Sequence, residues 1–262
     1  MSVLLSPQSR LLGLIIAATI LWTIESLLPF YRYEKHRLRR ALPNIAFTVL
    51  LVLTNLLLSF VTACVANFVM DKRIGMFFLF DMPSGLTALF GVMALDLSTY
   101  FAHLLMHKSW LGWQFHRVHH SDVEVNVTTA FRQHPGETLW RILWQLLAVA
   151  IFGLPLSVVV VYLLISTLNA QLEHTNVKLF APVDRVLRLL IVTPNMHKVH
   201  HSREQIETDS NYSNIFSIWD RIFGTYTATV DFSCLRYGLD GFDDREKQTL
   251  PALLKLPLLH ET

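Results

Sequence analysis

The stretch His116-Arg117-Val118-His119-His120-Ser121 recurs 81 positions later as His197-Lys198-Val199-His200-His201-Ser202. A further histidine pair, His103 and His107, comes shortly before the first copy. The chain holds 12 histidines, and ten of them fall between residues 103 and 201. Both the expected fold and the expected function follow from this concentration of imidazoles.

The composition around the histidines is that of a membrane protein. Hydrophobic residues make up 52% of the chain, charged residues only 16%, and the mean hydropathy is +0.40. Soluble domains carry roughly 25% charged residues. A net charge of +2 without a basic stripe gives no indication of a nucleic-acid partner. The two cysteines, Cys64 and Cys234, are too few for a disulfide framework or a cysteine metal site.

Long apolar runs predict an all-α, multi-pass transmembrane helical bundle of about four spans. We expect spans at residues 11–28, 44–70 and 85–106. Residues 138–167 are interrupted at Gly153-Leu154-Pro155 and predict two antiparallel half-spans or a helical hairpin. Residues 183–192 are too short to cross and are expected at the interface or against the bundle. The first run has no cleavage site after it, so no signal peptide is predicted.

The orientation follows from the loop at residues 31–40, which holds five basic residues and is therefore predicted to be cytoplasmic. Counting spans from this loop brings all the clustered histidines to the cytoplasmic side, in a helical cap carrying a dimetal site. We expect a single domain over residues 1–262. Its parts are N-terminal spans (1–84), a histidine-rich catalytic region (85–230) and a cytoplasmic C-terminal tail (231–262).

Helical periodicity gathers the imidazoles. His103 and His107 are spaced i, i+4, and each repeat is spaced i, i+3, i+4, so each set projects from one helix face. Asp96 and Tyr100 share the stripe of His103 and are expected to accept hydrogen bonds from metal-bound rings. Thr193-Pro194 predicts an N-cap followed by proline at the first helical position, which would start a helix just before His197.

Imidazoles packed this closely repel one another when protonated and are costly to desolvate when neutral. A bound cation resolves both problems, and the number of rings suits two ions. Imidazole binds iron, zinc, copper and nickel. Zinc peptidases place a glutamate after the first histidine, whereas Arg117 and Lys198 stand here, so iron-based oxygen chemistry is favoured over hydrolysis. Arg117 and Lys198 themselves are expected to be solvated or near lipid phosphates.

The three histidine sets resemble the histidine boxes of the fatty acid hydroxylase/sterol desaturase superfamily of membrane di-iron enzymes. The resemblance covers roughly residues 90–230. Other matching stretches are Arg132-x-His134-Pro135-x-Glu137, Glu173-His174-x-Asn176, Asn211-Tyr212, and Trp219-Asp220-Arg221-Ile222-Phe223-Gly224-Thr225-Tyr226.

The resemblance implies two iron ions, which can be replaced by zinc on purification, and a set of histidine ligands. His174 matches an additional ligand between the second and third boxes. His134 is either a helix-end residue, an outer-shell group or an extra ligand. The implied ligands are His103, His107, His116, His119, His120, His174, His197, His200 and His201.

The resemblance also implies an oxidoreductase that uses O2 to hydroxylate an unactivated C–H bond of a lipid, such as a sterol or fatty acyl chain. Desaturation by the same site is the alternative. Electrons would come from a separate reductase, ferredoxin or cytochrome-type protein. A metal transporter or haem protein is the non-enzyme alternative, although haem needs only two axial ligands. The short chain hints at a bacterial inner membrane.

Overall fold

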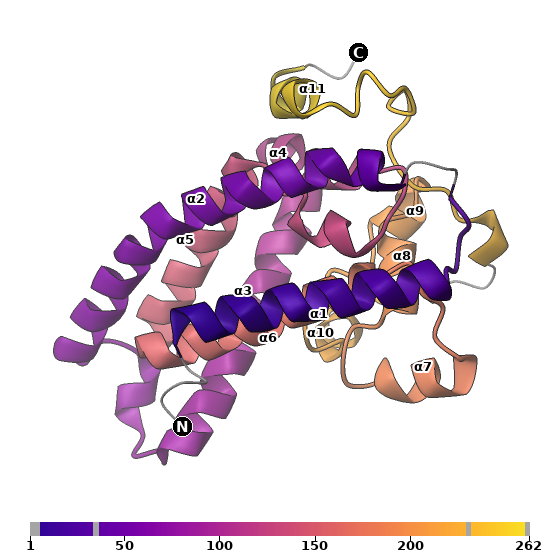
Figure 1. The fold of residues 1–262 in the computed structure, drawn as a ribbon. Helices are drawn as coiled ribbons and strands as arrows, with labels where there is room; N and C mark the ends of the chain where they lie inside the picture. The colour runs from indigo at the N-terminus through magenta and orange to yellow at the C-terminus, as the bar shows by residue number, and fades with distance from the viewer. Residues whose placement is uncertain (1–5, 34–36, 229–231, 260–262) are drawn as a thin grey trace.

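The computed structural model describes residues 6–33, 37–228 and 232–259, and every regular element in these residues is helical (Figure 1). Residues 34–36 of the basic loop, and parts of the C-terminal tail, lie outside them. The long helices are α1 (Pro7–Leu27), α2 (Arg37–Asp71), α3 (Ser84–Lys108), α5 (Pro135–Phe152) and α6 (Leu156–His174). The short ones are η2 (Met76–Leu79), α4 (Trp110–His120), η3 (Val127–Phe131), α7 (Ala181–Leu187), α8 (Pro194–His200), α9 (Gln205–Thr208), α10 (Ile218–Ile222), η4 (Phe232–Cys234), α11 (Leu250–Lys255) and η5 (Leu256–Leu258).

Four helical segments are long and apolar enough to cross a membrane: α1, the segment Arg37–Leu79 that contains α2 and η2, α3, and α6. The predictions of an all-α fold and of about four spans are therefore confirmed. The chain is a multi-pass membrane protein.

The break predicted at residues 153–155 is present, but the pieces on either side are longer than half-spans. Gly153 ends α5 in the left-handed conformation, with φ 76°, which glycine adopts without strain. Pro155 is the N-cap of α6, which then runs without interruption to His174. From this turn the two helices diverge, so the hairpin is open (Figure 1). Helix α6 extends seven residues beyond the predicted end and carries His174 to the other imidazoles.

Helix α3 lies at the centre, in contact with α4, α5 and α6. Its buried Leu95 joins Val149 of α5 and Val159 of α6 in the main apolar core. Asp96, on the next position of α3, is fully buried and accepts hydrogen bonds from the backbone amides of Ile215 (3.0 Å) and Phe216 (2.9 Å). This carboxylate fixes the polar segment that follows the second repeat against the central helix.

Helix α1 runs beside α6 (Figure 1), and a buried acid near its end connects it to the segments around both repeats. Glu25 is 1% exposed and accepts hydrogen bonds from the amides of Val127 (3.1 Å) and Asn176 (2.8 Å). Its other oxygen pairs with Arg37 at the start of α2. A carboxylate inside an apolar span is costly unless it is paired in this way.

The C-terminal segment does not extend freely into solvent. Leu253 of α11 and Leu256 of η5 are buried in a small core with Phe47 of α2 and Val118 of α4. Helix α7, which overlaps the region 183–192 expected at the interface, has only seven residues and exposes Val183 and Val186. Its position at the membrane interface stays a prediction.

Candidate metal centre

Each histidine repeat forms a short capped helix. Ser109 caps α4 by accepting a hydrogen bond from the amide of Gly112 (3.2 Å), and the helix ends at His120. Thr193 caps α8 through the amide of Met196 (3.2 Å), with Pro194 at the first helical position. The predicted helix start before the second repeat is thus confirmed.

The structure brings the nine implied histidine ligands into two adjacent groups. Within each group the potential ligand atoms lie within 4.8 Å of one another. The groups meet where the rings of His120 and His201 stack, with centroids 4.7 Å apart. One group is His103, His107, His116, His120 and His200, and the other is His119, His174, His197 and His201.

The hydrogen bonds on the outer side of the rings favour a cation between them. His119 Nδ1 lies 3.3 Å from the carbonyl oxygen of Arg132, and His174 Nδ1 lies 2.7 Å from that of Ala170. A carbonyl oxygen only accepts, so both Nδ1 atoms carry the proton and both Nε2 atoms present lone pairs. These two Nε2 atoms are 3.1 Å apart. Neither can donate to the other, and a shared cation makes the contact favourable.

The spacing of the ring nitrogens also suits metal ligation. The Nε2–Nε2 distances are 3.0 Å for His103 with His116 and 3.0 Å for His197 with His174. Two nitrogen ligands at right angles, each about 2.1 Å from one ion, lie about 3.0 Å apart. The residues therefore fit two metal ions, and a donor set of imidazoles suits iron, zinc, copper or nickel. That each histidine is a ligand stays a prediction.

Burial keeps the rings of the two repeats in the neutral form that ligates metals. Burial, followed by the charges of neighbouring imidazoles, holds the pKa of His116, His120 and His197 well below the ordinary 6.5. The same causes act on the pKa of His201.

Two acids that the sequence did not single out for this role contact the outer side of the first group. Glu137 Oε1, fully buried at the start of α5, lies 3.1 Å from His116 Nδ1. Asp209 Oδ1 lies 3.4 Å from His107 Nδ1. Such partners orient metal-bound imidazoles and raise their basicity. The available signal was the position of Glu137 in the motif around His134.

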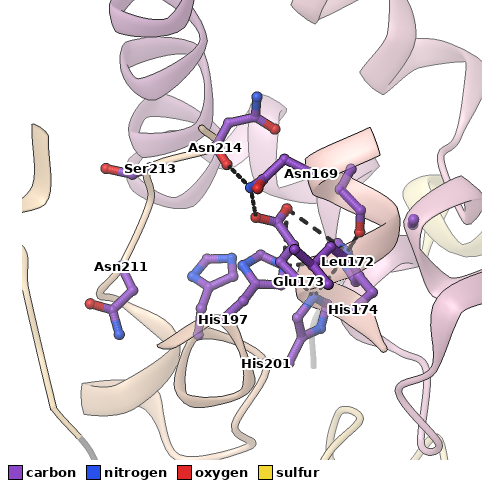
Figure 2. Close-up of polar contacts among 12 residues, drawn as sticks. Asn169, Leu172, Glu173, His174, His197, His201, Asn211, Ser213 and Asn214 are labelled. Atoms are coloured by element: carbon purple, nitrogen blue, oxygen red, sulfur yellow. Dashed lines mark hydrogen bonds and ion pairs between the residues drawn. The ribbon is translucent and has the colours of Figure 1, made fainter. Parts of the chain in front are cut away.

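A third buried acid, Glu173, lies beside the second group (Figure 2). Its Oε1 is 3.9 Å from His197 Nε2 and 3.9 Å from His174 Nδ1. Asn169 donates to its other oxygen at 3.1 Å and to the carbonyl oxygen of Asn214 at 2.6 Å. The carboxyl group is thereby held beside His174 and His197, where its ionised form would balance a bound cation.

The three residues suggested as outer-shell groups have other contacts. Asp96 lies about two helical turns from His103. Both of its carboxylate oxygens accept hydrogen bonds from residues 214–219. Tyr100 hydrogen-bonds Thr225 through its hydroxyl (2.9 Å). His134 is the N-cap of α5, where its Nδ1 accepts from the amide of Gly136 (3.0 Å), and it belongs to neither group.

Arg117 and Lys198 differ from expectation, because both are buried. Arg117 donates to the carbonyl oxygens of Leu256 (2.6 Å) and Leu259 (2.5 Å) in the C-terminal segment. Lys198 donates to the carbonyl oxygens of Thr175 (2.8 Å) and Val177 (2.9 Å). Burial lowers the pKa of Lys198 to about 7. Arg117 therefore holds the C-terminal segment against the first repeat, and Lys198 holds the segment that follows α6 against the second.

A sequence model of the fatty acid hydroxylase family matches residues 88–225, which is more than half of the chain and includes all nine histidines. The chain belongs to the fatty acid hydroxylase family. The predicted relationship to the fatty acid hydroxylase/sterol desaturase superfamily is confirmed.

Relatives of this chain include enzymes with different named activities. Human alkylglycerol monooxygenase is 36% identical over 155 residues, 57% of this chain and 33% of the human protein. Ornithine lipid hydroxylase OlsE from Rhizobium tropici is 30% identical over 145 residues, 55% of this chain and 43% of that protein. A very-long-chain aldehyde decarbonylase from Oryza sativa is 27% identical over 143 residues, 50% of this chain and 21% of the relative.

The matched segment covers less than half of each of these relatives. No solved structure matches the chain significantly.

Proposed function

We propose that the protein is a membrane di-iron oxidoreductase that uses O2 to hydroxylate an unactivated C–H bond of a lipid. The observation that carries this proposal is the convergence of imidazole nitrogen atoms into two groups, almost all of them buried, within a bundle that has four helices able to cross a membrane. The names of the relatives support it, because two of them are a lipid hydroxylase and an alkylglycerol monooxygenase.

The hydroxylation consumes one O2, two electrons and two protons. A C–H bond of the lipid becomes C–O–H, and the second oxygen atom leaves as water. When bound, two iron ions would supply the activation of O2. One ion would be held by the group containing His120, and the other by the group containing His119.

The chain's own residues orient the ligands and exclude water. Backbone carbonyl oxygens and the Glu137 carboxylate face the Nδ1 side of the rings, which leaves Nε2 directed inward. The histidines of both repeats are buried, so bulk water is kept from the reacting atoms. A lipid substrate would reach this site sideways from the bilayer.

The electrons would come from a separate reductase, ferredoxin or cytochrome-type protein. We place the histidine groups on the cytoplasmic side of a bacterial inner membrane. The basic start of α2 supports this, because Arg40 pairs with Glu124 (2.7 Å), four residues after His120. The donor would therefore dock on the cytoplasmic face.

Desaturation is the alternative within the same site. There the lipid loses two hydrogen atoms, and both oxygen atoms of O2 leave as water with the same two electrons and two protons. The test is lipid profiling of cells that express the wild-type chain or His119→Ala. One added oxygen atom in a lipid supports hydroxylation, whereas the loss of two hydrogen atoms supports desaturation.

Metal analysis of the purified chain tests the non-enzyme alternative. We expect about two ions per chain in the wild type, following the two imidazole groups. A Soret band would instead indicate a haem protein, and an unchanged lipid profile with bound metal would favour a metal-transport role.

A further inference from the structure

A cavity of about 400 Å³ lies among α2, α5 and α6, of which α2 and α6 are long and apolar enough to cross a membrane. Along α6 it is lined from Leu156 to Ala170, a length of about 21 Å at the helical rise. Its rim includes Asn55 and Leu163, which are exposed on the surface of the bundle. The cavity is therefore long enough for part of a lipid and is reached from the bilayer side.

The walls of this cavity are mainly apolar, but they carry several polar side chains within the membrane bundle. Polar side chains come from four helices: Asn55, Thr99, Arg141, Gln145, Tyr162 and Ser166. Some of them satisfy one another, since Tyr162 donates to Thr99 at 2.6 Å. A polar group facing hydrocarbon costs free energy unless it finds a partner, and such groups mark binding sites in membrane proteins.

Three of the polar side chains have hydrogen-bonding capacity left over. Asn55 and Gln145 have no hydrogen-bond partner within the described chain. Arg141 Nε donates to Glu137 Oε1 (3.0 Å), and Arg141 Nη2 lies 2.9 Å from the same oxygen. The N–H groups of Arg141 Nη1 remain available as donors. Because Glu137 balances the Arg141 charge, the occupant needs oxygen acceptors but no net charge.

The polar side chains that line the cavity lie close to both histidine groups. The Glu137 oxygen that Arg141 contacts is 3.1 Å from His116 Nδ1, in the first group. The Ala170 carbonyl oxygen, at the inner end of the cavity, accepts from His174 of the second group at 2.7 Å. A headgroup bound by Arg141 would therefore lie next to the metal centre.

We infer that this cavity binds the oxygen-bearing polar part of a lipid, its headgroup or glycerol backbone, through Arg141, Gln145 and Asn55. The carbon that is oxidised then lies in or beside that polar part, and not in the middle of an acyl chain. This inference rests on the proposed function, because it names the substrate class of the same site.

The test compares the wild type with Asn55→Leu/Gln145→Leu, which removes both free amides without touching the histidines. Asn55→Gln/Gln145→Asn keeps the amides, and Thr23→Val removes a polar group from the exposed face of α1. The full chains are expressed in the same cells, and total membrane lipids are analysed by tandem mass spectrometry. Phospholipid that copurifies with each protein in detergent is quantified as well, together with the metal content of the same samples.

We expect the added oxygen on the headgroup, the backbone or an adjoining carbon. Product and copurified polar lipid should fall at least about tenfold in the leucine double variant, as expected for two lost hydrogen bonds. The amide-retaining variant should recover most of the product and copurified lipid that the leucine double variant loses. Thr23→Val should match the wild type, and metal content should be unchanged in all variants. Oxygen inserted in mid-chain, or a leucine double variant with wild-type lipid binding, would overturn the inference.

The two proposals can fail separately. Oxidised lipid with the oxygen in mid-chain leaves the proposed function standing and removes the inference. Selective loss of copurified polar lipid in the leucine double variant, with no oxidised lipid in any sample, supports the binding site and contradicts the oxygenase.

Discussion

The two histidine repeats are nearly identical in sequence, yet each divides its rings between the two groups in the opposite way. In the first repeat His116 and His120 belong to one group and His119 to the other. In the second repeat His200 alone joins the group of His116, whereas His197 and His201 join that of His119. Neither repeat forms a site by itself, and each group needs both.

The helical period explains the division. Successive residues are rotated by about 100°, so the rings at i+3 and i+4 lean to opposite sides of the ring at i. One helix face can therefore serve two neighbouring ions. The shared motif fixes the spacing of the rings, and the approach of two such helices completes the pair of sites.

Removing histidines in pairs is the strongest test of how the rings divide between the two groups. His119→Ala/His197→Ala takes two rings from one group and should leave about one ion per chain. His119→Ala/His200→Ala takes one ring from each group and should weaken the binding of both ions. Lipid oxidation should be abolished in both variants. Metal content by mass spectrometry of the purified chain is the measurement.

His134→Ala provides the matched control, because this histidine lies in neither group. It should keep both ions and lose only the stability of a helix cap, about 1 kcal/mol. Metal loss that follows the repeats, with both ions kept in the mixed pair, would contradict the division.

The pH dependence of stability should be alike for the two repeats. In the metal-free folded protein the pKa of these histidines is lowered, whereas in the unfolded chain it is near 6.5. Below that pH the unfolded state binds more protons. Stability is therefore fully present above about pH 6.5 and falls on acidification. Thermal unfolding of the chelator-treated protein from pH 8 to pH 5 measures it.

Removing two rings from either repeat should flatten this dependence. His116→Ala/His120→Ala and His197→Ala/His201→Ala are expected to reduce the acid-induced loss by similar amounts. A loss on acidification that neither variant reduces would mean that other groups titrate.

The acids beside the imidazoles should distinguish the repeats. In the first repeat a carboxylate oxygen of Glu137 lies 3.1 Å from His116 Nδ1, whereas in the second the nearest, from Glu173, is 3.9 Å from His197 Nε2. Glu137→Gln should weaken the metal affinity of the group that contains His116 by about 10- to 100-fold. The second ion should be retained. Glu124→Gln, which changes a buried acid paired with Arg40, is the control. Competition with a chelator measures both affinities, and equal loss of the two ions would argue against a local role for Glu137.

The smallest effect is expected from the cations inside the repeats. Lys198→Met leaves the carbonyl oxygen of Val177 without a donor and takes one of two donors from that of Thr175, which keeps the amide of Val177, and should cost about 1–3 kcal/mol. Arg117→Met should cost a similar amount by freeing the C-terminal segment. Lys178→Met, at an exposed position, should stay within about 0.5 kcal/mol. Unfolding in denaturant measures these changes, and a neutral Lys198→Met would show that its bonds add nothing.

Local patterns predicted much of the fold from the sequence. The apolar runs marked the spans, Gly153 and Pro155 marked the turn between α5 and α6, and Thr193-Pro194 marked the start of α8. Each of these signals acts within a few residues, so the sequence alone carries it. The end of α6 was placed too early, because Ser166, Thr167 and Asn169 resemble a loop when their tertiary partners are unknown.

The contacts across the chain could not be predicted in the same way. Asp96 was correctly placed on the stripe of His103, but its partners are amides 119 and 120 positions away. Arg117 and Lys198 look like solvated cations in sequence, and only the packing of remote carbonyl oxygens explains their burial. The division of the rings between two groups likewise depends on how α4 meets α8.

The buried carboxylate of Glu25 makes the first span more than an anchor. It joins α1 to the segment that follows the first repeat and to the turn just after His174. Exchanging this span for a generic hydrophobic helix would preserve insertion but would release both connections. A replacement that retains this single acid at the same depth is the simplest way to shorten or redesign the N-terminal part of the protein.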